Sequence, residues 1–320
     1  MKIEYMDWIK QIENANQKNK GKYDIIVPLS GGKDGTFVLW YLKKYTNLNV
    51  LAFHIDNYYV SDEAIINAKK VCKELDCDLE IYRPSWKQIQ KFYKELLYAT
   101  GEICIACEMM ISLLPIEFAI SHRIPYIAWG LTPKQIASKK FDKGIMPIDL
   151  NYYNKISNYY GSIIKSVFKK NDEAGCQIKE RFLKNDYMED DQCPVFIFPF
   201  YYLGYDATMI ERTVSENTGW KRPIMVGGTS SNCVINKLHI YIKKRIKGEE
   251  YYKKILEKKA DAKEVVDSVV QHALKNELSS EQIDEFLREL EINESIDEVI
   301  DIIRNYKKDI ILKMESNISQ

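Results

Sequence analysis

Residues 23–36 read YDIIVPLSGGKDGT, and the helix-forming stretch FVLWYL follows at 37–42. An apolar run that passes through a glycine turn into a helix is typical of the first strand and helix of a parallel α/β sheet. Neighbouring glycines let backbone N–H groups surround an anion without interference from a Cβ, and the helix dipole adds positive potential. The stretch therefore predicts a phosphate-binding loop between a strand and a helix.

The chain around this loop alternates short apolar runs with amphipathic stretches, as expected of parallel strands joined by helices. The pattern predicts strands at 23–29, 49–56, 78–83 and 126–130, with helices at 35–45, 62–75, 87–99 and 107–122. Further on it predicts a strand at 195–200, a helix at 207–219 and a strand at 223–228. The predicted fold class is α/β, a three-layer parallel sheet whose ligand site lies at the carboxyl ends of the strands.

The domain organisation follows from changes in composition along the chain. We expect an N-terminal helical segment at 1–20, an α/β domain at 21–248 with a polar insertion at about 131–192, and a helical C-terminal extension at 249–320. Capping boxes at Ser279–Gln282 and Ser295–Glu298 predict the starts of the last two helices. Their apolar stripes suit packing on the core or a homodimer interface.

Overall composition excludes some partners. Lys plus Arg and Asp plus Glu number 46 each, so no global field draws the chain onto nucleic acid, although a tRNA substrate stays open. A membrane span and a signal peptide are not indicated, so we expect a cytoplasmic location and no membrane partner. Seven cysteines in such a chain are not typical of a disulfide framework.

The glycine loop resembles the SGGxDS signature of the N-type ATP pyrophosphatase (PP-loop) family, which has a HUP/adenine nucleotide alpha hydrolase-like fold. The resemblance implies ATP and Mg²⁺ as ligands, adenylation of a substrate oxygen and release of pyrophosphate. It implies catalytic roles for Lys33 and Asp34, with Asp34 helping to position the metal. Gly35 replaces the usual serine, and the hydroxyl of Thr36 is a candidate substitute. The implied ATP-binding residues of the loop are Ser30, Gly31, Gly32, Lys33, Asp34, Gly35 and Thr36.

Other candidates for the ATP site lie at the ends of predicted strands. The second strand ends around His54 and Asp56, where the resemblance implies backbone contacts to adenine. Asp56 equally suits a turn or a helix cap, and His54 suits the core. Gly130 ends the fourth strand and is assigned to the same site. Polar candidates for a substrate pocket, which also suit surface loops, are Lys134, Asp190 and Asp191.

Three cysteines form a second candidate site. Cys104 and Cys107 come just before a long apolar helix, where a helix N-terminus favours thiolates, and Cys233 follows a turn-rich stretch that runs into another helix. The pair alone suits a redox centre, zinc or a cluster. Three cysteines can hold a [4Fe-4S] cluster with one iron open, whereas structural zinc normally takes four ligands. The cysteines interpreted as core or loop residues are Cys72, Cys77, Cys176 and Cys193.

This order of loop, cysteine pair and distant cysteine resembles the cluster-dependent tRNA thiolation enzymes. That resemblance implies Cys104, Cys107 and Cys233 as catalytic cluster ligands, a sulfur donor or carrier as partner, and a tRNA or small-molecule substrate. Residues 101–107, 125–130, 220–221 and the stretch 227–233 that ends at Cys233 are also similar to the N-acetyl sugar amidotransferase branch. This second resemblance implies ammonia from a glutaminase subunit, with the cysteines serving zinc or structure. A non-catalytic nucleotide sensor on the same fold is the third alternative.

Overall fold

The structure is a computed structural model, and it describes residues 9–10, 12–13, 21–138, 144–183, 193–223, 232–248, 250 and 278–306. The chain divides into two compact units. The first unit comprises Met1–Arg83, Met110–Tyr159 and Phe182–Ile224, and the second comprises Pro84–Met109, Tyr160–Arg181 and Met225–Gln320.

The first unit contains a six-stranded sheet with the order β3-β2-β1-β4-β6-β5. Neighbouring strands are parallel except β5, which runs antiparallel to β6. The α/β class is thereby confirmed, with one antiparallel edge strand that the sequence did not indicate. The strands are β1 (Ile25–Pro28), β2 (Val50–Ile55), β3 (Asp78–Tyr82), β4 (Tyr126–Ala128), β5 (Ile145–Pro147) and β6 (Val195–Ile197).

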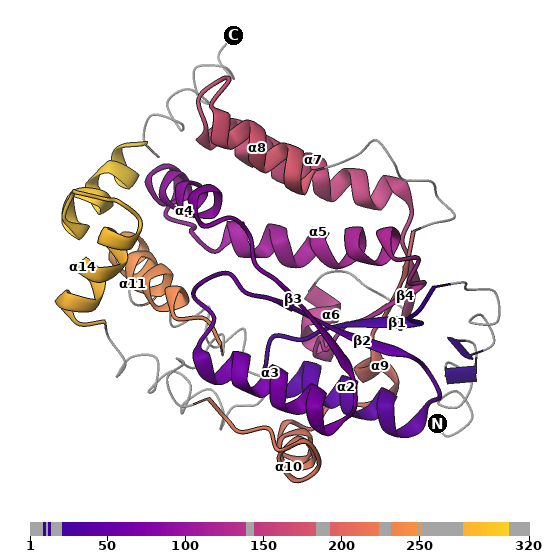
Figure 1. Cartoon of the computed structure of the whole chain (residues 1–320). Coiled ribbons are helices and arrows are strands. Elements are labelled where there is room, and N and C mark those ends of the chain that lie inside the picture. The colour runs from indigo at the N-terminus through magenta and orange to yellow at the C-terminus, as the bar shows by residue number, and fades with distance from the viewer. Residues whose placement is uncertain are drawn as a thin grey trace. The chain divides into compact units, whose positions relative to one another are not determined.

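Helices cover both faces of this sheet, which gives the predicted three layers (Figure 1). On one face lie α2 (Lys33–Tyr45) and α3 (Asp62–Glu74), and α10 (Ala207–Thr218) packs against both. On the other face lies the part of α5 (Ile105–Ser121) that belongs to this unit, and the rings of Phe118 and Phe53 are 5.0 Å apart.

The central strand β1 is buried on both faces, because helices cover it from either side. Ile25, Ile26 and Val27 each have 0% exposure, which explains why this strand is continuously apolar rather than alternating. From β1 the strand order proceeds to β2 and β3 in one direction and to β4, β6 and β5 in the other. The boundary between β1 and β4 is therefore a topological switch point, where open α/β sheets bind their ligands.

Some predicted elements differ in the structure. The strand expected at 195–200 stops at Ile197, because the helix α9 (Pro199–Leu203) begins with a proline that suits the first helical position. The predicted strand at 223–228 lies outside the described residues from 224 onward, as do Asp190 and Asp191. The region 131–192, predicted only as an insertion, contains α6 (Pro133–Ser138), β5, α7 (Leu150–Val167) and α8 (Glu173–Phe182).

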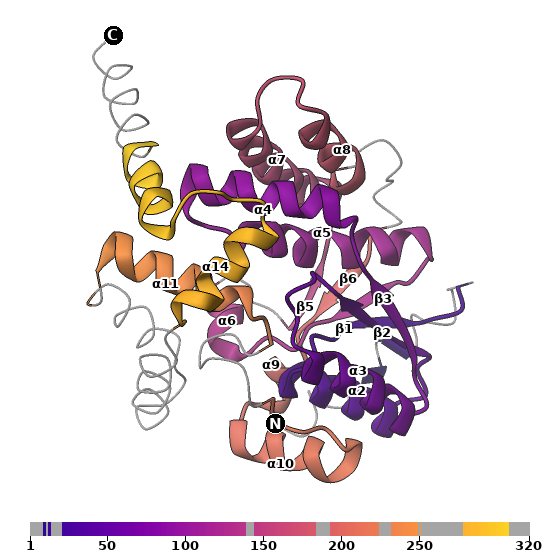
Figure 2. The same ribbon diagram turned by 60° about the vertical axis from the view of Figure 1, so that its left-hand side comes forward.

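The described part of the second unit is helical (Figure 2). It includes α4 (Trp86–Thr100), α11 (Ile235–Lys247), α14 (Ser280–Glu289) and a helix at 296–306. Both predicted capping boxes are confirmed, since Ser279 and Gln282 bond reciprocally, as do Ser295 and Glu298. Among the described residues of the whole chain, no helix combines the length and the apolar character that crossing a membrane requires.

Candidate functional site

The glycine loop turns directly into α2. The helix begins at Lys33, two residues before the predicted start, so Lys33, Asp34 and Gly35 form its first turn. Its N-cap is Gly32, with φ −83° and ψ 164°, and no side chain caps the helix. An N-terminus without a side-chain cap leaves backbone N–H groups available to an anion, and the helix dipole favours negative charge there.

Gly31 sets the shape of the loop. Its φ is +78°, and a Cβ at this position would stand 2.2 Å from the carbonyl oxygen of Ala64 on α3. The Gly31 carbonyl accepts a hydrogen bond of 2.8 Å from Trp220 Nε1 and a longer one of 3.4 Å from Asn67 Nδ2. The loop therefore needs glycine here, and side chains from two distant segments hold its carbonyl in place.

The segment that follows β4 packs closely against the same loop. A Cβ on Gly130 would stand 2.7 Å from the backbone nitrogen of Gly35. A Cβ on Gly35 would itself stand 3.1 Å from the carbonyl oxygen of Pro28, which is tight. The two glycines thus let β1, the loop and β4 converge at the switch point, and this crowding is a physical reason for glycine where the resembling family has serine.

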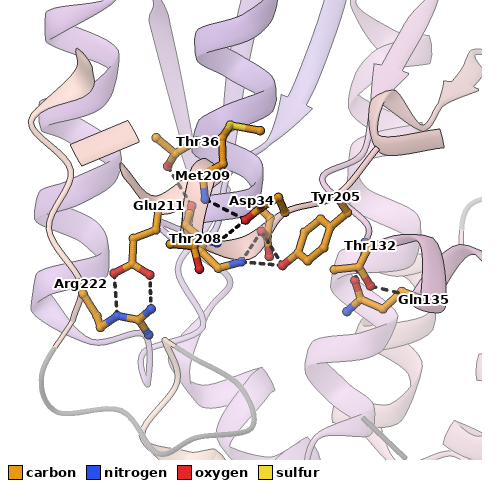
Figure 3. A network of polar contacts seen from close by, with 12 residues as sticks. Asp34, Thr36, Thr132, Gln135, Tyr205, Thr208, Met209, Glu211 and Arg222 are labelled. Atoms are coloured by element: carbon orange, nitrogen blue, oxygen red, sulfur yellow. Dashed lines mark hydrogen bonds and ion pairs between the residues drawn. The ribbon is translucent and has the colours of Figure 1, made fainter. Parts of the chain in front are cut away.

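Three side chains form a polar cluster at the start of α2 (Figure 3). Lys33 Nζ lies 2.6 Å from Asp34 Oδ1 and donates a second bond of 2.6 Å to the Tyr205 hydroxyl. The Tyr205 hydroxyl in turn donates to Asp34 Oδ1 at 3.2 Å. Lys33 also stands 5.0 Å from the centre of the Tyr205 ring. A cation is consequently held beside the loop by a carboxylate and an aromatic hydroxyl.

The two hydroxyls of the loop have different surroundings. Thr36 is 0% exposed, and its Oγ1 donates to the Gly32 carbonyl at 2.8 Å. The hydroxyl considered as a replacement for the missing serine thus closes the first turn of α2. Ser30 is exposed at the loop surface.

His54 and Asp56 lie at the carboxyl end of β2 and are both buried. His54 Nδ1 is 2.7 Å from the Leu29 carbonyl, and because a carbonyl only accepts, the proton lies on Nδ1. Burial lowers the pKa of His54 from its usual value, so the ring is neutral. Asp56 Oδ2 accepts from Arg83 Nε at 2.8 Å, and its Oδ1 accepts from the Tyr58 backbone at 2.9 Å. In this conformation both side chains shape the strand end.

Further polar pairs surround the cluster. Arg222 and Glu211 form a two-point ion pair in which Nε and Oε1 are 2.8 Å apart (Figure 3). Thr132 and Gln135 exchange bonds of 2.9 and 3.3 Å that cap α6. Lys134, a predicted substrate candidate, is exposed in the first turn of α6.

In the second unit, the structure brings the three predicted cysteines together at the starts of two helices. Cys104 and Cys107 lie at the beginning of α5, and Cys233 lies just before α11. A hydrogen bond with Cys233, followed by burial, raises the pKa of Cys107 well above its usual value. Burial raises the pKa of Cys104 to about 12. The pKa values of Cys104 and Cys107 are thus raised, through burial and the Cys233 hydrogen bond, in spite of the expected effect of the helix N-terminus.

Polar neighbours surround these thiols within the second unit. The Tyr93 hydroxyl is 3.2 Å from Cys107 Sγ, and Asn236 Nδ2 donates to Cys104 Sγ at 3.6 Å. Nearby, Lys243 Nζ is 2.7 Å from Glu102 Oε2. Within the described part of the chain, no set of three or more His, Cys, Asp or Glu side chains has the arrangement needed to hold a metal ion in this conformation.

Sequence reasoning missed Asn67 and Tyr205. Asn67 anchors Lys221 through bonds of 2.7 and 3.1 Å in addition to its contact with Gly31, and Tyr205 holds Lys33. Neither residue belongs to a local motif. In the sequence, only Trp220 pointed to the support of the loop. It was part of the resemblance to the amidotransferase branch, but that resemblance did not indicate which residue Trp220 contacts.

Fold and loop together define an α/β protein with an anion-binding geometry at the switch point of its sheet. No family model matches the chain. A curated relative, the uncharacterized protein MJ1599 of Methanocaldococcus jannaschii, is 31% identical over 127 residues, which is 37% of this chain. The matched region covers 45% of that relative, so this chain spans less than half of the relative's length.

Two solved structures have a weak overall similarity. The U34-tRNA thiolase NcsA from Methanococcus maripaludis, with its [4Fe-4S] cluster, is 14% identical with a TM-score of 0.36, over 95% of this chain and 79% of that one. The NH3-dependent NAD synthetase from Campylobacter jejuni is 12% identical with a TM-score of 0.31, over 58% and 96% respectively. At such scores neither likeness establishes a family or a reaction for this chain.

Proposed function

We propose that this chain is an N-type ATP pyrophosphatase that transfers AMP from ATP to a substrate oxygen and releases pyrophosphate. The observation that carries the proposal is the N-terminus of α2, which has no side-chain cap and lies at the switch point with Lys33 beside it. Gly31 and Gly130 let the loop pack against the backbones of Ala64 and Gly35, and this close packing sets the shape of the loop.

In the proposed reaction, the substrate oxygen attacks the α-phosphorus of ATP. A bond forms between that oxygen and phosphorus, and the bond to the pyrophosphate oxygen breaks, so negative charge grows on the leaving pyrophosphate. The N–H groups of the first turn of α2 and the Lys33 ammonium stabilise this charge. Asp34 supplies the carboxylate oxygens that Mg²⁺ prefers and would hold the ion beside the phosphates.

For the second step we propose sulfur insertion, with Cys104, Cys107 and Cys233 as ligands of a [4Fe-4S] cluster. The proposal is supported by the neighbourhood of the three thiols, which act on one another's pKa values, and a cluster would draw them from their present arrangement, which is not that of a metal site, into a ligand set. When bound, such a cluster supplies an iron position without a protein ligand, to which sulfur can attach. Asn236 donates a hydrogen bond to Cys104, and the Tyr93 hydroxyl, 3.2 Å from Cys107 Sγ, would donate to that sulfur once it is a thiolate ligand, so both would orient the ligands. A sulfur donor or carrier and a tRNA or small-molecule substrate are the corresponding partners.

A second candidate is amide nitrogen transfer to an N-acetyl sugar, with ammonia supplied by a glutaminase subunit. One observation favours it: Trp220, part of that resemblance, bonds directly to the phosphate loop at Gly31. The adenylation step is the same in both proposals. Under this second candidate the cysteines bind zinc or have a structural role.

The adenylation proposal is tested by ATP titration in a calorimeter and by assay of released pyrophosphate. Lys33→Ala should weaken ATP binding at least tenfold, a loss of about 1.4 kcal/mol. Lys43→Ala is the matched control, because that lysine bonds the Asp76 carbonyl at the C-terminal end of α2, away from the loop. ATP binding that is equal in both variants would refute the assignment. Binding without any pyrophosphate across substrate classes would favour a nucleotide sensor.

The sulfur step is tested by anaerobic purification, an absorption spectrum, and iron and labile-sulfide assays. Wild-type protein should be brown, and Cys104→Ala, Cys107→Ala and Cys233→Ala should each lose the colour and the iron. Cys176→Ala, which removes an exposed cysteine, should keep both. Colourless wild-type protein with zinc or no metal would exclude the cluster and favour nitrogen transfer.

A further inference from the structure

The C-terminal end of α3 brings together two cysteines that the proposed function does not use. Cys77 N–H donates to the Cys72 carbonyl at 2.9 Å, and Asp76 N–H donates to the Lys73 carbonyl at 3.3 Å. Asp76, between these bonds, has φ +46°. This pair of bonds around a left-handed residue is the Schellman motif, in which the side chains at the positions of Cys72 and Cys77 contact each other.

The two thiols differ in access and in hydrogen bonding. Cys72 is 3% exposed and belongs to the core, whereas Cys77 is half-buried at the start of the edge strand β3. The two sulfurs share a hydrogen bond, and the Cys77 thiol also lies 3.2 Å from the Val50 carbonyl and 3.4 Å from the Asp78 carbonyl, to either of which it can donate. The bond between the sulfurs raises the pKa of Cys72, and together with the charge of Lys43 it lowers the pKa of Cys77. Cys77 is therefore the more acidic and the more accessible thiol of the pair.

We propose that Cys72 and Cys77 are an oxidation site that hydrogen peroxide converts to an intramolecular disulfide. Cys77, once it has lost its proton, attacks one peroxide oxygen; the O–O bond breaks, a sulfenic acid forms, and the hydroxide that leaves takes up a proton to become water. The Cys72 sulfur then attacks the Cys77 sulfur, the hydroxyl leaves with the Cys72 proton as a second water, and the S–S bond forms. The two sulfurs lose two electrons in total, and the peroxide gains them.

The disulfide can form within the end of α3, without movement of other parts of the chain. Because the Schellman bonds already hold the two residues in contact, the disulfide closes across one helix end and requires no rearrangement of distant segments. The backbone bond between Cys77 and Cys72 and the start of β3 stay in place. The site contains no residue of the phosphate loop, so its test needs no nucleotide.

Peptide mapping of the full-length protein tests the proposal directly. After peroxide treatment and alkylation of free thiols, trypsin cleavage at Lys73 places Cys72 and Cys77 on separate peptides that only a disulfide can join. We expect the joined pair to form at least tenfold faster than oxidation of the exposed Cys176. In Cys72→Ala, a sulfenic-acid trapping reagent should label Cys77 and no joined peptide should form.

Two results would overturn the site. The first is a wild-type protein whose Cys77 oxidises no faster than Cys176. The second is a wild-type protein in which Cys77 oxidises quickly but Cys72 stays open to alkylation after denaturation. If Cys72→Ala folds poorly, Cys77→Ser tests the same proposal. This variant lacks the sulfur that attacks peroxide, so Cys72 should stay reduced during peroxide treatment.

Discussion

A Cβ placed on Gly130 would stand 2.7 Å from the backbone nitrogen of Gly35, so the end of β4 and the first turn of α2 meet backbone to backbone. These two segments come from opposite sides of the switch point, and their contact leaves no space for a side chain.

Gly130→Ala should displace the first turn of α2 and weaken ATP binding at least tenfold, at a cost of about 1–3 kcal/mol in stability. Gly35→Ala should cost less, because its Cβ would stand 3.1 Å from the Pro28 carbonyl. Calorimetric titration with ATP and urea unfolding of both variants measure which of the two substitutions has the larger effect on binding and on stability. Equal effects, or a larger effect at Gly35, would contradict the geometry of the switch point.

Tyr205→Phe should slow pyrophosphate formation about tenfold or more, because the Lys33 ammonium loses a charge-assisted hydrogen bond while the aromatic ring remains. The KM for ATP should change less than kcat if the hydroxyl positions Lys33 for the transition state. Tyr201→Phe, on the exposed side of α9, is the control and should leave both parameters unchanged. A Tyr205→Phe variant with the kcat of the wild type would show that the Tyr205 hydroxyl does not position Lys33.

Trp220→Phe should reduce the free energy of unfolding by about 1–3 kcal/mol, since the Gly31 carbonyl loses its shorter hydrogen bond in a buried place. ATP binding should weaken as well, because the loop is less firmly held. Trp40→Phe gives the comparison, as it shortens another buried tryptophan without touching Gly31. The prediction fails if only Trp40→Phe affects ATP binding.

Acid should destabilise the protein through His54. Burial lowers the pKa of the folded ring, so the unfolded chain binds a proton first as the pH falls below the usual histidine value. Stability from this residue is thus full above that value and is lost toward the lower pKa of the folded state. His54→Asn, which keeps an N–H donor, should show a smaller loss between about pH 7.5 and 5.5 in urea unfolding.

Exposed His122 provides the control for this pH dependence. His122→Asn should keep the acid sensitivity of the wild type, because the proton uptake that matters occurs at the buried ring. A His54→Asn variant with unchanged acid sensitivity would show that another group carries the effect.

The local parts of the fold could be predicted from the sequence. The run 23–29, the glycines at 31 and 32 and the amphipathic stretch after them specify strand, turn and helix without help from the rest of the chain. The same is true of the two C-terminal capping boxes, whose signals span four residues. The end of β6 was missed because Pro199 suits a strand end and a helix start equally well.

The support of the loop could not be predicted, because it depends on tertiary contacts. Asn67 appears in the sequence as an ordinary helix residue, and only the packing of α3 beside the loop brings it to Gly31 and Lys221. Tyr205 lies in a short connection with many other tyrosines nearby. The hydrophobic pattern likewise could not predict the order of the strands, since β1 pairs with β4, and β4 with β6, across long stretches of the chain.

The hydrogen bond between Gly31 and Trp220 spans 189 positions of the chain. During synthesis the glycine loop leaves the ribosome early, whereas the side chain that fixes its carbonyl emerges only after most of the protein has been made. Long-range contacts of this kind form late and slowly. A nascent chain would thus contain the glycine loop long before the loop is fixed in place, and the proposed ligand ATP would stabilise only chains whose first unit is complete.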